Sequence, residues 1–210
     1  DLEFKKMVLD AHNKIMSFSL SVPKIGILFG SLDYLTSRTK EDDSVGFSQN
    51  AVFFTMNGKM EKVSAKTLLP NYDVFDESRY HYPLDIDKQS SSNILIHSGK
   101  RIGISICEDM WFSKNKEVYL KNPMNKFKNQ NIDIIVNISA SPYELGKDKN
   151  RKQIISSIIN DFKVPFVFVN QVGGNDGLVF DGGSGVFTDN SCFRLPYFCK
   201  SIDSIDIDNL

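Results

Sequence analysis

Hydrophobic and polar residues follow two kinds of spacing in the first part of the chain. Residues 2–17 carry apolar side chains at intervals of three and four, which predicts an amphipathic helix. The run 25–29 (IGILF) is almost wholly apolar and predicts a buried strand. Residues 36–48 are polar and charged, so we expect a loop there.

Two hairpins are predicted from dipeptides that favour tight turns. Asn57-Gly58 separates two strand-like runs, and this pair favours a two-residue turn because both positions take a positive φ. Ser98-Gly99 separates two further runs in the same way. The predicted strands are 50–56 with 59–64, and 94–97 with 100–106.

Helical and strand patterns alternate in the second half. Four isoleucines within 148–161 share one helical face and predict an amphipathic helix. Residues 114–130 are helical in tendency but are interrupted by Pro123. Buried strands are predicted at 132–138 and 164–169. Hairpins followed by this alternation predict an α/β layered domain with a mixed sheet.

Composition and charge narrow the classes of function. The 210 residues include 25 Lys+Arg and 26 Asp+Glu, for a net charge of −1. This balance gives no electrostatic reason to expect a nucleic acid or a membrane as partner. Three cysteines and three histidines lack the spacing of zinc ligands, so we expect no metal. We expect a cytoplasmic protein with one domain over 1–200 and a tail over 201–210. Because the first residue is not Met, the N-terminus is interpreted as truncated.

Cys107 is the first candidate for chemistry. It follows the run 100–106, and a side chain at the C-terminal end of such a strand faces the crevice where α/β folds bind ligands. Backbone N–H groups of a turn that begins there can lower the pKa of a thiol and hold an oxyanion. The alternative is a structural cysteine, the commonest role of a buried one.

Three other segments carry candidate features. Lys66 would place positive charge against a tetrahedral intermediate, although most lysines are solvated surface residues. Ser141 and Lys147 lie in the segment 139–147, which suits a loop that holds a carboxylate and equally an ordinary helix entry. The glycines of 173–185 match neither a dinucleotide fingerprint nor a phosphate loop and predict tight turns.

Four motifs, taken in order, resemble the nitrilase superfamily. They are KTLLPNYDVFDESRY at 66–80, GISICEDMW at 103–111, NISASPYELGK at 137–147 and VNQVGGNDGLVFDGGS at 169–184. Within that superfamily the chain most resembles the glutaminase (amidase) domain of bacterial-type, glutamine-dependent NAD synthetases. The similarity extends over most of the chain.

The resemblance implies a fold and a reaction. The fold is an αββα sandwich, N-terminally truncated in this chain. The catalytic triad is Glu-Lys-Cys, in which Cys107 matches the nucleophile and Lys66 the lysine. The thiolate attacks the side-chain amide of glutamine and releases ammonia, and water hydrolyses the resulting thioester to glutamate. Lys66 and the N–H after Cys107 would stabilise the oxyanion.

The resemblance also implies binding residues and partners. Tyr72, Glu108, Ser141 and Lys147 match positions that hold glutamine, with Glu108 at its α-ammonium group and Lys147 at its α-carboxylate. No cofactor is implied in this domain. Ammonia would pass to a C-terminal synthetase domain of the same chain, which uses ATP and Mg²⁺ to amidate nicotinic acid adenine dinucleotide to NAD. A homo-oligomer is implied as well.

One residue of the triad has no match. The family's glutamate lies upstream of everything in this chain, whereas Glu61 and Glu77 belong to other motifs. The 210 residues alone are therefore expected to be inactive. Two alternatives remain: a stand-alone amidase or carbamoylase of the same superfamily, and a non-catalytic module. A synthetase motif (SGGxDS) beyond Leu210 would separate the first alternative from a fused glutaminase.

Overall fold

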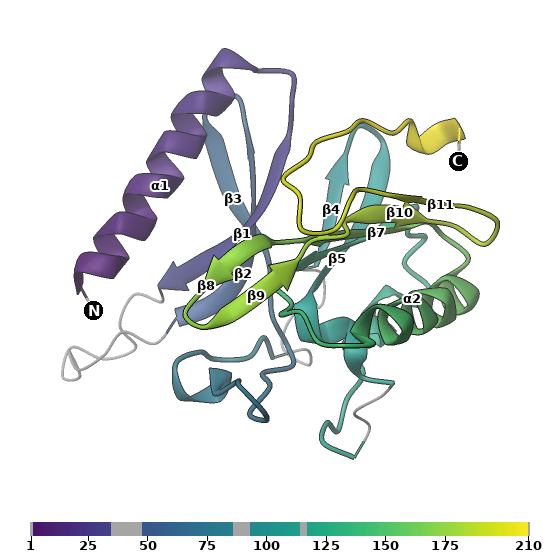
Figure 1. Cartoon of the computed structure of the whole chain (residues 1–210). Coiled ribbons are helices and arrows are strands. Elements are labelled where there is room, and N and C mark those ends of the chain that lie inside the picture. Colours follow the sequence, from purple (N-terminus) through teal and green to yellow (C-terminus); the bar gives the residue numbers. More distant parts are fainter. Residues whose placement is uncertain (1, 35–47, 86–92, 114–116, 210) are drawn as a thin grey trace. The chain divides into compact units, whose positions relative to one another are not determined.

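The computed structural model describes residues 2–34, 48–85, 93–113 and 117–209, which contain two α-helices and eleven strands (Figure 1). These elements fall into two units, residues 1–93 and 94–210. The predicted loop 36–48 lies outside the described residues except for its last position, which begins a strand.

The first unit is a helix with a three-stranded antiparallel sheet in the order β1-β2-β3. The predicted hairpin is confirmed: Asn57 and Gly58 have φ values of 49° and 72° and join β2 to β3. The predicted first strand is also confirmed, but it continues well beyond residue 29. The elements are α1 (Leu2–Ser21), β1 (Ile27–Tyr34), β2 (Ser48–Met56), β3 (Lys59–Ala65) and the 3-10 turn η1 (Glu77–Arg79).

Polar side chains connect α1 to its sheet. His12 is buried, and its ring lies 4.7 Å from that of Phe53, while its Nε2 is 2.7 Å from Ser31 Oγ. Ser19 Oγ accepts a hydrogen bond from Gly58 N at 2.8 Å. The predicted apolar stripe of this helix is partly exposed, as at Met7. The helix was thus predicted correctly, but its buried face was not, because its buried residues are the polar His12 and Ser19.

The second unit is a six-stranded mixed sheet in the order β11-β10-β7-β6-β5-β4, with a separate β8–β9 hairpin. Strands β5, β6 and β7 run parallel, and β4, β10 and β11 are antiparallel to their neighbours. The mixed sheet is as predicted. The strands are β4 (Ile94–His97), β5 (Lys100–Ile106), β6 (Ile134–Ser139), β7 (Phe166–Asn170), β8 (Val172–Asn175), β9 (Leu178–Asp181), β10 (Gly185–Phe187) and β11 (Cys192–Arg194).

Helix α2 (Lys147–Phe162) covers part of this sheet. Its isoleucines at 154, 155, 158 and 159 are all buried and pack with Phe166 and Phe168 of β7, which confirms the predicted amphipathic helix. The helix begins after Gly146, whose φ of 83° is a conformation that favours glycine. The position of this glycine places Lys147 at the first turn of the helix.

The helical tendency predicted for 114–130 is wrong where the structure describes it. A single 3-10 turn, η3 (Pro123–Phe127), takes its place, and residues 114–116 lie outside the described part. Asn122 Oδ1 caps this turn by accepting a hydrogen bond from Met124 N at 3.0 Å. Proline at the first position suits the start of a helix but prevents one from passing through it.

The glycine-rich segment contains tight turns, as predicted, but it also forms strands β8 and β9, which were not predicted. Gly182 and Gly183 have φ values of 66° and 63°. A Cβ at Gly182 would lie 2.3 Å from a methyl group of Val172, and one at Gly183 would lie 2.3 Å from the ring of Tyr197. These positions therefore require glycine for space as well as for conformation.

Candidate active site

Three parallel strands of the second unit end at one edge of the sheet. The register pairs Ile106 of β5 with Ile138 of β6, and Ser139 of β6 with Asn170 of β7. The residues that follow these strand ends, including Cys107 and Ser141, are therefore brought to one edge. Ligands bind at this edge in open α/β sheets.

Cys107 occupies a strained backbone position at that edge. Its φ is 41°, a region that few residues other than glycine adopt, and it begins the 3-10 turn η2 (Cys107–Trp111). The buried side chain of Asn137 donates to the carbonyl oxygen of Cys107 at 3.5 Å and to Ser105 Oγ at 2.8 Å. Strain of this kind persists only where the surroundings impose it, and it is common at active sites.

Two buried carboxylates follow the cysteine. Glu108 accepts a hydrogen bond from the Tyr119 hydroxyl at 3.2 Å. Asp109 accepts a hydrogen bond at 3.4 Å from the backbone N–H of Ile106, the residue that precedes the cysteine. The turn after β5 therefore carries a buried carboxyl group on each of the two residues that follow Cys107.

Lys126 of η3 should make the stability of this unit depend on pH. Burial lowers its pKa from 10.5 to about 8, and the charge of Asp109 opposes that shift. Unfolding therefore takes up a proton between about pH 8 and 10.5, and the free energy of unfolding rises with pH in this window. In a Lys126→Gln variant of the full-length protein, the stability deficit relative to wild type should grow between pH 8 and 10.

The stability deficit of Lys126→Gln is measured by hydrogen exchange of peptides from β5 and β6, with variant and wild type compared at equal pH. The exposed Lys128→Gln is the matched control and should show no such trend. A deficit that stays constant from pH 8 to 10 would contradict the assignment of the shift to Lys126.

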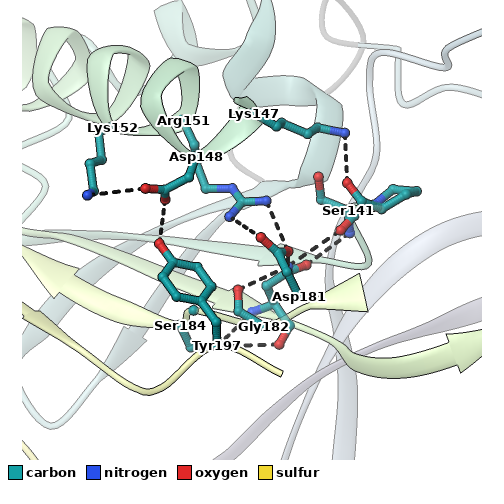
Figure 2. Close-up of polar contacts among 12 residues, drawn as sticks. Ser141, Lys147, Asp148, Arg151, Lys152, Asp181, Gly182, Ser184 and Tyr197 are labelled. Atoms are coloured by element: carbon teal, nitrogen blue, oxygen red, sulfur yellow. Dashed lines mark hydrogen bonds and ion pairs between the residues drawn. The ribbon is translucent and has the colours of Figure 1, made fainter. Parts of the chain in front are cut away.

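Ser141 and Lys147 lie in the segment between β6 and α2. Ser141 is buried, and its backbone N–H donates to Asn170 Oδ1 at 2.9 Å. Lys147 Nζ donates to the carbonyl oxygen of Pro142 at 3.1 Å (Figure 2). It also lies 5.8 Å from the centre of the Trp111 ring. The segment therefore places the Lys147 ammonium group beside the turn that Cys107 begins.

Lys66 is buried in the first unit, directly after β3. Its side chain is 1% exposed, so the surface alternative is wrong. Its backbone is anchored on both sides: Lys66 N donates to Asn50 O at 2.7 Å, and Leu84 N donates to Lys66 O at 2.8 Å. Its ammonium group pairs with Glu77 Oε1 at 2.6 Å.

Tyr72 lies in the loop that follows, between Lys66 and Glu77. Its side chain is exposed, and its ring packs edge-to-face against that of Phe75, with 6.0 Å between the ring centres. The structure thus brings Lys66 together with Glu77 in the first unit. Cys107, Glu108, Ser141 and Lys147 lie in the second unit, the last two in one segment.

Sequence reasoning missed several polar residues of these segments that are buried or, like Glu77, half-buried. Glu77 was assigned to a motif without a role, although it lies only eleven positions after Lys66 in the same motif. Arg151 shared the helical face of the buried isoleucines, and a charged residue on such a face was a usable signal. Asp181 and Asn170 carried no comparable signal, because their partners lie far away in sequence.

The described residues include no helix that could cross a membrane. The same part of the chain holds no group of three or more His, Cys, Asp or Glu side chains placed to bind a metal ion. No family model matches the chain.

Comparison with known proteins gives clear relatives. The chain is 41% identical over 166 residues to a glutamine-dependent NAD(+) synthetase from Synechocystis, covering 76% of this chain and 28% of that protein. The structure of a glutamine-dependent NAD+ synthetase from Acinetobacter baumannii matches with a TM-score of 0.71 and 28% identity, over 92% of this chain and 33% of that one. An amidase from the nitrilase superfamily, from Nesterenkonia, matches with a TM-score of 0.66 at 13% identity, over 91% and 64%.

These likenesses define first a class: the chain has the fold of the nitrilase-superfamily carbon–nitrogen hydrolases, as predicted. Within that class it belongs to the family of glutamine-dependent NAD synthetases. The chain spans less than a third of the length of the curated relatives it matches.

Proposed function

We propose that this chain is the glutaminase part of a glutamine-dependent NAD synthetase. The observation that carries the proposal is the 41% identity to a protein of that name. The strained cysteine at the end of a parallel strand supports it, because a sharp turn directly after a strand is one way in which hydrolases expose a nucleophile. The activity of the whole protein, including its synthetase reaction, is part of the same proposal.

The proposed reaction proceeds through a covalent intermediate on Cys107. The thiolate attacks the side-chain amide carbon of glutamine, the C–N bond breaks, and the nitrogen leaves as ammonia after it takes up a proton. Water then attacks the thioester and releases glutamate and the thiol. The Glu of the triad, which moves these protons, is expected from a segment outside the four motifs of this chain.

The chain's own residues would bind the substrate and stabilise charge. Lys66, buried and paired with Glu77, would place its ammonium group at the developing oxyanion, together with the N–H that follows Cys107. Lys147 would bind the α-carboxylate and Glu108 the α-ammonium group of glutamine, with Ser141 and Tyr72 completing the site.

Ammonia would pass to a synthetase domain of the same protein, which would bind ATP and Mg²⁺ and amidate nicotinic acid adenine dinucleotide. The short span of the chain relative to its relatives supports a fused arrangement of this kind. We include a cytoplasmic homo-oligomer in the proposal, since enzymes of soluble metabolism are commonly symmetric assemblies.

Two measurements on the full-length protein test this function. Glutamine labelled with ¹⁵N in its side-chain amide should transfer the label to the carboxamide of NAD, as detected by mass spectrometry. Addition of hydroxylamine should divert the thioester to γ-glutamyl hydroxamate, because a stronger nucleophile than water intercepts it.

The alternatives predict other outcomes. A stand-alone amidase would release labelled ammonia without any incorporation into NAD. A non-catalytic module would form neither glutamate nor hydroxamate. Either result would overturn the proposed function.

A further inference from the structure

A buried amide holds the backbone of Ser141 from two sides. Asn170 Oδ1 accepts from Ser141 N at 2.9 Å, and Asn170 Nδ2 lies 3.5 Å from Ser141 O. The same Nδ2 donates to Asp181 Oδ1 at 3.0 Å and to Gly182 O at 3.1 Å. The orientation of the Asn170 amide is therefore set by Asp181 and Gly182, and the position of Ser141 follows from it.

Asp181 is in turn fixed by Arg151 of α2. The two guanidinium nitrogens Nη1 and Nη2 donate to the two carboxylate oxygens at 3.1 and 3.3 Å, and both side chains are buried (Figure 2). The guanidinium group also lies 4.8 Å from the centre of the Phe168 ring. A bidentate pair of this kind constrains direction as well as distance. It ties the first turns of α2, which Lys147 begins, to the end of β9.

Asp148, directly after Lys147, is held by a second set of contacts. It accepts a hydrogen bond from the Tyr197 hydroxyl at 2.5 Å and pairs with Lys152 at 3.1 Å (Figure 2). It also accepts a hydrogen bond from Arg194 Nη2 at 2.8 Å. These donors hold the pKa of Asp148 well below its usual range, against the effect of burial. The first turn of α2 is thus anchored through Asp148 and through Arg151.

We propose that Asn170, Asp181 and Arg151 are positioning residues for glutamine binding: they touch no substrate atom but fix Ser141 and Lys147. This rests on the proposed function, in which these two residues hold glutamine. The chain of contacts runs from Arg151 through Asp181 and Asn170 to the Ser141 backbone. It is buried, so water cannot replace a lost partner.

Loss of this positioning should weaken binding more than chemistry. In the full-length protein, Asn170→Ala should raise the KM for glutamine by about ten-fold or more, because a misplaced binding residue loses its contact with the substrate. The kcat should stay within about three-fold of wild type, since Cys107 is held by other contacts. Ammonia-dependent NAD formation and the rate at which iodoacetamide alkylates Cys107 should not change.

A double variant separates positioning from stability. Asp181→Leu combined with Arg151→Met removes both charges and keeps apolar volume, so no buried charge is left unpaired and the unfolding temperature should stay near that of wild type. Asn170 then loses its Asp181 acceptor, so the KM for glutamine should still rise. The matched control is Asn160→Ala, an exposed asparagine of α2, which should leave every parameter unchanged.

Three results would overturn the inference or its basis. An unchanged KM in both Asn170→Ala and the double variant would show that these residues position nothing. A parallel fall of kcat, alkylation rate and unfolding temperature in both would show a role in stability alone. A wild-type protein that does not hydrolyse glutamine would instead overturn the proposed function, and that result is seen before any variant is made.

Discussion

Replacement of Cys107 by alanine should abolish glutamine-dependent NAD formation while ammonia-dependent formation persists. Without the sulfur no thioester can form, and water would have to attack a stable amide directly. Removal of a covalent nucleophile costs about 10⁴-fold or more in kcat. In the proposed function the synthetase domain takes its nitrogen from ammonia, so an external ammonium salt should bypass the defect.

Glutamate release and NAD formation, each measured with glutamine and with ammonium chloride, test this expectation. Cys199→Ala is the control, because Cys199 is an exposed free thiol of the same unit and should behave as wild type. Glutaminase activity that survives in Cys107→Ala would remove Cys107 from the mechanism. Loss of both activities would point to damage to the fold and would require the milder Cys107→Ser.

Replacement of Lys66 by methionine should lower glutamine hydrolysis by about 10²–10³-fold, the usual loss when one donor to an oxyanion is removed. Lys66 is almost completely buried, so its ammonium group cannot be replaced by water.

Replacement of Glu77, the residue that pairs with Lys66, tests the same site from the other side. Glu77→Gln leaves that ammonium group without its carboxylate, which should reduce both activity and stability.

The kcat for glutamine and the unfolding temperature should be measured together for both variants. Lys62→Met is the matched control: Lys62 lies on the same strand β3 but pairs with Asp33 at the surface, and such pairs contribute about 0–1 kcal/mol. Full glutaminase activity in Lys66→Met would exclude Lys66 from the site. An effect of Glu77→Gln on stability alone would restrict Glu77 to a structural role.

Local patterns predicted most of the regular structure, because the features that specify it are close together in sequence. The Asn57-Gly58 turn and the isoleucine face of α2 are examples, since each is read within one turn or one helix. The helical tendency expected for 114–130, with its interruption at Pro123, gave way in the described residues to a single 3-10 turn that Pro123 begins, because proline can start a helix but cannot continue one.

The candidate site was predicted only in part. The position of Cys107 after an apolar run was sufficient to place it at a strand end, but its positive φ could not be read from the sequence. The burial of Lys66 and its pair with Glu77 were also invisible, because lysine is usually exposed and the two residues are eleven positions apart in sequence.

The sequence by itself determined helices α1 and α2, strands β1 to β7, the family resemblance and the identity of the candidate nucleophile, since these depend on local spacing and on motifs. The short strands β8 to β11 were not predicted. The tertiary structure decided which side chains are buried together. Arg151, Asp181 and Asn170 come from a helix and two strands, and only the packing of these elements brings them within hydrogen-bonding distance. Buried polar groups must find partners wherever the fold supplies them, and a linear sequence does not record that choice.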